Sequence, residues 1–131
     1  MQNPAPEATR AERGTTMAMK LITKELERKM DHYPLYSQEG KGNDAVVICK
    51  FFNPYGGQSW YVLEAGSVWN GDRELFVLST YGGESEYGYM MLSDFLKTKV
   101  KFCGYELPLE RDRWFKGTVA DALKDAGVGR W

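Results

Sequence analysis

The stretch from Trp60 to Leu92 constrains the fold of this sequence more than any other part. It contains three runs of β-branched, aromatic and apolar residues, separated by two turn signals, Asn70-Gly71 and Gly82-Gly83. Strand-forming runs joined by such dipeptides are typical of antiparallel β-hairpins. The stretch therefore predicts an antiparallel meander, against which the rest of the chain packs.

The predicted strands have different characters. The first is almost continuously apolar (AVVICKFF), which is typical of a strand in the middle of a sheet. Trp60 begins the second, and we expect its ring to pack in the core beside Phe51 and Phe52. Glu64 lies near the end of that strand, where we expect its carboxylate to reach solvent. Strands are predicted over residues 45–52, 59–65, 74–81, 86–92 and, more briefly, 99–103.

Helices are predicted at both ends of the globular part. The first runs from Thr23, which can cap it, to about Met30. The second begins with a capping-box-like pair, Thr118 and Asp121, and ends at Gly127. The predicted fold class is therefore α+β: an antiparallel β-meander of four to five strands with N- and C-terminal helices packed on it.

Composition and charge limit the domain organisation and the class of protein. The chain has 131 residues, which predicts one domain, over 19–131. Residues 1–18 have almost no apolar content, which predicts a disordered N-terminal tail. The net charge of −1 gives no general attraction to nucleic acid or to an anionic membrane. No apolar run approaches membrane-spanning length.

The few residues that support catalysis are scattered. Two cysteines, Cys49 and Cys103, are too few for a disulfide framework and are not spaced like zinc ligands, which indicates a cytoplasmic protein with free thiols. His32 is the only histidine and lies at a predicted helix end, which favours a capping or surface role. We expect no catalytic residue, metal or cofactor. Cys103, near Lys101, is the better candidate for a reactive thiol.

Short motifs follow one another in a recognisable order along the chain. The motifs are MKLIT (19–23), LYSQE (35–39), KFFNP (50–54), WYV (60–62), EYGY (86–89), LSDF (92–95), LPLERD (107–112) and WF (114–115). Their order resembles the bacterial family called domain of unknown function 2958 (DUF2958), over residues of about 19–123. The resemblance implies a small cytoplasmic bacterial protein, often encoded near mobile-element genes, and it implies no accepted activity.

Tyrosines near the second turn signal are candidates for an interaction site. Tyr81, Tyr87 and Tyr89 surround Gly82-Gly83, and strand periodicity places Tyr87 and Tyr89 on one face. Facing outward, these rings suit a protein partner or stacked bases. Facing inward, they are core residues under a helix, which is the interpretation we favour.

Basic residues give two further candidate interaction sites. One side of an extended segment carries three lysines, Lys97, Lys99 and Lys101. They either contact phosphate or protect an edge strand from pairing with another sheet, and we favour the edge strand. Arg111 and Arg113 alternate with acidic residues before two aromatic residues. They indicate either a recognition corner or an ion-pair network within the chain, and we favour the network.

The leading hypothesis is a non-enzymatic cytoplasmic protein-binding accessory factor that modulates host or defence machinery, its partner being another protein. The alternative is a single-stranded nucleic-acid-binding module in which the lysines and tyrosines act together. A small thiol-dependent enzyme that uses Cys103 comes third.

Overall fold

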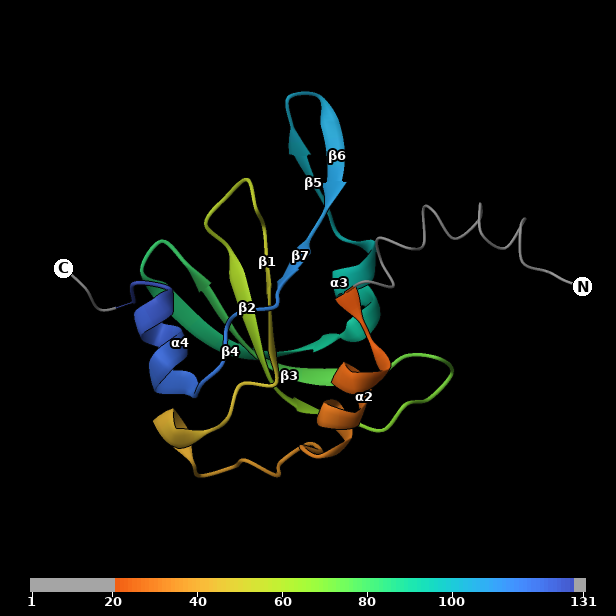
Figure 1. Cartoon of the computed structure of the whole chain (residues 1–131), viewed down its shortest axis with the longest axis vertical. Coiled ribbons are helices and arrows are strands. Elements are labelled where there is room, and N and C mark those ends of the chain that lie inside the picture. The colour runs from red at the N-terminus through yellow and green to blue at the C-terminus, as the bar shows by residue number, and fades with distance from the viewer. Residues whose placement is uncertain (1–20, 129–131) are drawn as a thin grey trace, which may run out of the picture.

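The computed structural model describes residues 21–128, so the predicted tail over 1–18 lies outside the described residues. A five-stranded antiparallel sheet with the order β4-β3-β2-β1-β7 forms its centre, which confirms the predicted α+β class (Figure 1). The sheet contains β1 (Cys49–Phe52), β2 (Ser59–Ala65), β3 (Glu74–Tyr81), β4 (Glu84–Met91) and β7 (Glu110–Asp112).

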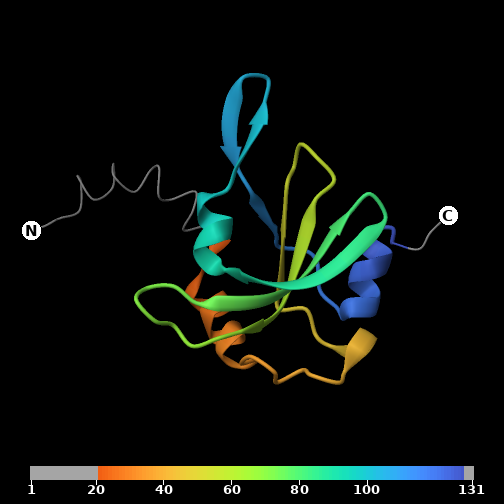
Figure 2. The ribbon, with the colours of Figure 1, turned by 180° about the vertical axis from the view of Figure 1, so that it is seen from behind.

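Two further strands form a separate hairpin. β5 (Lys99–Phe102) pairs with β6 (Tyr105–Pro108). Cys103 and Gly104 make the turn between them, and both have positive φ angles, as a two-residue hairpin turn requires. This hairpin extends beyond the end of the sheet in opposite views of the molecule (Figures 1 and 2).

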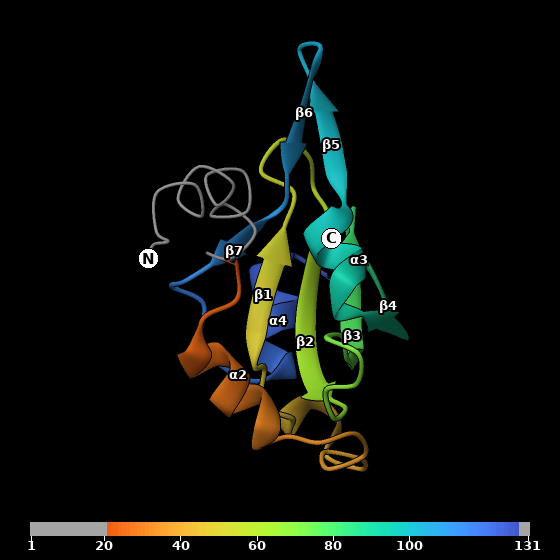
Figure 3. The same ribbon diagram turned by 90° about the vertical axis from the view of Figure 1, so that its right-hand side faces the viewer.

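Helices cover the sheet from two sides. α2 (Lys24–Asp31) and α3 (Leu92–Lys97) lie in front of it in Figure 3, and α4 (Val119–Asp125) lies behind it. We call these sides the α2/α3 face and the α4 face. A 3₁₀ helix, η1 (Gly42–Asp44), lies near α4. No helix in the described part of the chain is long and apolar enough to cross a membrane.

The α2/α3 face carries a closed apolar core. The rings of Phe51 and Phe95 stack with their centroids 4.8 Å apart. Trp60 is only partly buried. It lies opposite Phe51 in the β1–β2 pairing, as expected, and its ring packs edge-on against that of Phe95, with the centroids 5.9 Å apart. Other core residues on this face are Leu26, Met30, Ile48, Val62, Leu75, Val77, Leu92 and Leu109.

A polar network holds α4 against the sheet. Oδ2 of Asp125 accepts hydrogen bonds from Nζ of Lys50 and from the hydroxyl of Tyr61, both at 2.7 Å. Burial alone raises the pKa of Asp125, but these hydrogen bonds outweigh burial and lower it. Below the network, Val119 and Ala122 are fully buried against the apolar side chains of β2 and β3.

The first and last strands differ from the expectation. The predicted first strand starts at Ala45, whereas β1 starts at Cys49. Two of the preceding residues bond outside the sheet: Val47 donates its N–H to the carbonyl oxygen of Gly117, and the carbonyl oxygen of Ala45 accepts from the N–H of Val119. β7 pairs antiparallel with β1, although no strand is predicted there.

Candidate functional site

A β-bulge in β2 places an acidic side chain on the α4 face. Val62 pairs with Val77, and the register then shifts so that Glu64 pairs with Phe76. Leu63 and Glu64 consequently line the same cavity, although neighbours in a regular strand point to opposite faces. Bulges commonly redirect a side chain in this way.

The carboxylate of Glu64 is buried, which contradicts the expectation that it reaches solvent. The residue is 3% exposed. Its Oε1 accepts from the N–H of Tyr36 at 2.7 Å, and its Oε2 accepts from the N–H of Gln38 at 2.9 Å. These bonds compensate for the loss of hydration that burial imposes on a charged group. They also fix the connector between α2 and η1 against β2.

Gln38 attaches the same connector at a second point. Its amide nitrogen donates to the carbonyl oxygens of Val46 (2.8 Å) and Leu63 (2.7 Å), and its amide oxygen accepts from the N–H of Val46 (2.6 Å). The side chain is therefore fully used in holding three segments together. The connector forms a rigid wall beside the sheet.

Tyr36 is held in an unusual conformation at the top of this wall. Its φ angle is 72°, in the left-handed region that non-glycine residues rarely adopt. The residue is 63% exposed. Burial, the neighbouring Tyr36 and nearby carboxylates, including that of Glu64, raise the pKa of Tyr89. Backbone strain of this kind tends to cluster at ligand-binding sites.

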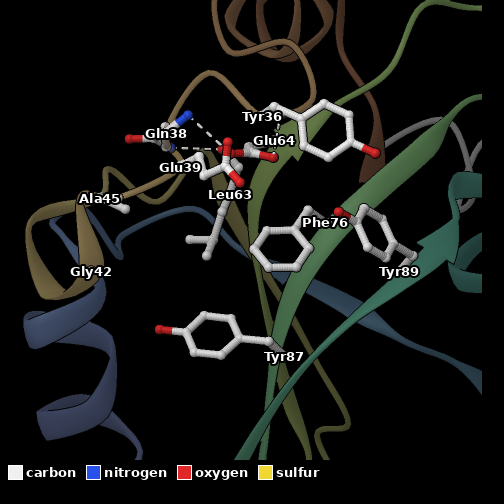
Figure 4. A pocket seen from close by; sticks show the side chains of 11 residues that line it. Tyr36, Gln38, Glu39, Gly42, Ala45, Leu63, Glu64, Phe76, Tyr87 and Tyr89 are labelled. Atoms are coloured by element: carbon white, nitrogen blue, oxygen red, sulfur yellow. Dashed lines mark hydrogen bonds between the residues drawn. The ribbon is translucent and has the colours of Figure 1, made fainter.

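These residues surround a cavity of about 350 Å³, which we call the Glu64 pocket (Figure 4). The ring of Phe76 lies parallel to that of Tyr87 at 5.6 Å and is tilted to that of Tyr89 at 5.0 Å. Two acidic residues and no lysine or arginine contribute to the lining. It consists of Tyr36, Gln38, Glu39, Gly40, Gly42, Ala45, Leu63, Glu64, Phe76, Tyr87 and Tyr89.

Tyr87 and Tyr89 lie on one face, as predicted, but not in a core. Each is 48% exposed, which contradicts the favoured interpretation that a helix covers them. The cause is the placement of α4, whose apolar residues pack against Tyr61, Leu63 and Leu78 and not against the β4 tyrosines. The rings of β4 are left at the surface beside Phe76.

A family model described as protein of unknown function (DUF2958) matches residues 21–123. The chain belongs to the DUF2958 family. Searches of curated proteins and of solved structures found no match. In this DUF2958 protein, the LYSQE motif noted in the sequence supplies Tyr36, Gln38 and Glu39 to the pocket. For Glu64, the sequence signal that could have indicated a site is that it is the only carboxylate in a largely apolar strand.

The other predicted interaction residues lie away from the Glu64 pocket. Tyr81 lines a separate cavity of about 240 Å³ together with Trp60, whose ring packs on the α2/α3 face. Lys97 ends α3, and Lys99 and Lys101 are exposed on β5. The structure therefore does not bring the lysines beside the β4 tyrosines. Arg111 and Arg113 line another cavity, at the opposite edge of the sheet.

The two thiols are in contrasting environments. Burial raises the pKa of Cys49 to about 12, despite the nearby charges of Arg111 and Lys29, so this thiol stays protonated at neutral pH. Cys103 is exposed at the tip of the β5–β6 hairpin. Across residues 21–128, no group of three or more histidine, cysteine or acidic side chains could hold a metal ion.

Proposed function

We propose that this DUF2958 protein is a non-enzymatic protein-binding accessory factor whose Glu64 pocket receives a basic side chain of the partner. The observation that carries this proposal is the lining itself: four aromatic rings and two carboxylates, with no cationic residue among them. Aromatic faces attract cations through their quadrupoles, and the attraction grows when the cation loses water. An arginine or lysine side chain matches this chemistry.

The exposed rings support a protein as the partner. Tyr36, Tyr87 and Tyr89 expose between 48% and 63% of their surface around one cavity. Tyrosine is enriched at binding hot spots, because its ring offers a large contact area at a low cost in conformational entropy. The hydrogen bonds of Glu64 and Gln38 hold the wall in place, so little ordering remains to be done on binding.

The cellular setting that we propose is the cytoplasm of a bacterium carrying a mobile element, in which the protein modulates host or defence machinery. The order of the sequence motifs and the two free thiols support this setting.

The arrangement gives less support to the single-stranded nucleic-acid alternative. Proteins that stack bases on aromatic rings place cations beside those rings to meet the phosphates. Here Lys97, Lys99 and Lys101 are on α3 and β5, outside the lining of the Glu64 pocket. Nucleic-acid binding also weakens steeply as salt rises, so a salt titration separates the two alternatives.

The test is affinity capture from a bacterial lysate with wild-type protein and two immobilised variants. We expect proteins retained by the wild type and by Tyr81→Ala, but not by Tyr87→Ala. Tyr81 is the matched control because it is an exposed tyrosine of the same sheet outside the pocket. N-acetylarginine amide should elute the retained proteins, whereas its neutral analogue with citrulline should not.

Two outcomes contradict the proposal. One is that the wild type retains nothing above background. The other is that Tyr87→Ala retains the same proteins as the wild type, which would place the interface elsewhere. If citrulline amide elutes as well as arginine amide, protein binding stands and the basic side chain is wrong.

A further inference from the structure

A second cavity, of about 380 Å³, lies beside β7 and beneath α2, and we call it the Arg111 pocket. It is separate from the Glu64 pocket, and the two share no lining residue. Its charge is opposite in character, because four cationic residues line it against two acidic ones. The lining comprises Glu25, Leu26, Lys29, Ile48, Cys49, Arg111, Asp112, Arg113, Phe115 and Lys116.

Arg111 is the residue that the fold alone does not explain. Its Nε is buried and has no hydrogen-bond partner in the part of the chain that the structure describes. Buried donors nearly always have partners, and an unmet one costs about 1–3 kcal/mol. Burial and the nearby charge of Arg113 lower the pKa of Arg111, although the carboxylate of Glu25, which lines the same cavity, partly opposes them. A bound anion at Nε would satisfy the unpaired donor.

Asp112, the acidic side chain of β7 that lines the same cavity, does not fill this role. Oδ1 of Asp112 accepts from the backbone N–H groups of Trp114 (2.8 Å) and Phe115 (3.0 Å). Its Oδ2 is 3.6 Å from Nζ of Lys50. Asp112 therefore shapes the turn after β7 and pairs with a different cation. The ion-pair network that the sequence favours for this segment does not supply a partner for Nε of Arg111.

From these observations we infer that the Arg111 pocket binds a small organic phosphate. The planar guanidinium of arginine matches the oxygens of a phosphate group, and the surrounding lysines add charge for a dianion. The cavity is large enough for more than the phosphate group alone. Phe115, Ile48 and Leu26 give the organic part an apolar surface.

The test is a titration of the full chain, in buffer free of phosphate and sulfate, with phenyl phosphate, orthophosphate and benzoate. The Nε–Hε signal of Arg111 in ¹⁵N-resolved NMR spectra is the readout. We expect phenyl phosphate to shift this signal saturably, orthophosphate to bind more weakly, and benzoate to bind most weakly. The inference is overturned if phenyl phosphate does not shift the Nε–Hε signal of Arg111. The choice of phosphate is overturned if benzoate binds as tightly as phenyl phosphate.

Two variants locate the site. Arg111→Gln should weaken phenyl phosphate binding about tenfold or more, the effect of losing a charged hydrogen bond. Lys101→Gln removes a cation from the exposed β5 strand and should leave binding unchanged. Equal weakening in both variants indicates diffuse attraction and overturns the inference. If Arg111→Gln does not fold, the wild-type signal decides the matter by itself.

Discussion

The two faces of the sheet differ in how completely helices cover their side chains. On the α2/α3 face, Phe51, Phe95 and Met30 are at most 1% exposed, and the core is closed by two helices. On the α4 face, one helix of seven residues covers the apolar part, and the rings of β4 remain at the surface. Apolar burial, which dominates folding, is more complete on the α2/α3 face, whereas the α4 face leaves Tyr36, Tyr87 and Tyr89 exposed around one cavity.

The strongest way to test this comparison is to truncate the closed core. Phe95→Ala should lower the free energy of unfolding by roughly 3–5 kcal/mol, because it removes a buried ring that stacks on Phe51. Urea denaturation measures this loss. The matched variant on the α4 face, Tyr87→Ala, should change stability by about 0.5 kcal/mol or less. Similar losses in both variants would show that the faces do not differ in this way.

Glu64 should matter for both stability and binding. Glu64→Gln places an amide N–H₂ where an oxygen now accepts a backbone N–H, so one buried donor loses its partner. The free energy of unfolding should fall by about 1–3 kcal/mol. Glu74→Gln, at the exposed start of β3, is the control and should have little effect. Unchanged stability of Glu64→Gln would mean that the connector does not depend on the carboxylate.

The smallest expected effect concerns pH and the attachment of α4. Because the folded-state pKa of Asp125 is lowered, its stabilising contribution is complete above the unfolded value, about 3.9, and is lost as pH falls through the folded value. Wild type should therefore exceed Asp125→Asn in stability at pH 7, and the difference should shrink toward pH 3. Thermal unfolding at both pH values measures it. If the difference in stability between the two proteins stays constant between pH 7 and pH 3, the protonation of Asp125 does not contribute to the pH dependence of stability.

Local sequence signals predict most of the sheet. β2 and β3 match the predicted ranges, because alternation and turn dipeptides act over a few residues. The capping box of Thr118 and Asp121 is confirmed at the start of α4 for the same reason. β7 was missed because its strand character comes from pairing with β1, which is distant in the sequence. Such pairing leaves no periodic signal in three residues.

The candidate sites were less predictable than the fold. Spacing placed Tyr87 and Tyr89 together, but the exposure of both rings depends on where α4 packs. Glu64 faces the pocket only because β2 bulges, and Tyr36 joins it only because the Glu64 carboxylate holds its backbone. Both effects arise from tertiary structure. The order of sequence motifs pointed to Tyr36 without indicating its role.

The left-handed backbone of Tyr36 lowers the stability of the fold, whereas its ring helps to form the pocket. Asparagine and glycine adopt φ angles near 72° more easily than tyrosine does, and a strained residue of this kind costs of order 1–3 kcal/mol. Because the tyrosine ring is largely exposed, replacing it sacrifices little packing. Laboratory evolution that selects only for heat resistance should therefore replace Tyr36 with asparagine or glycine, and the pocket would lose one of its aromatic rings. Tyrosine should be retained at this position only when the selection also requires binding through its ring.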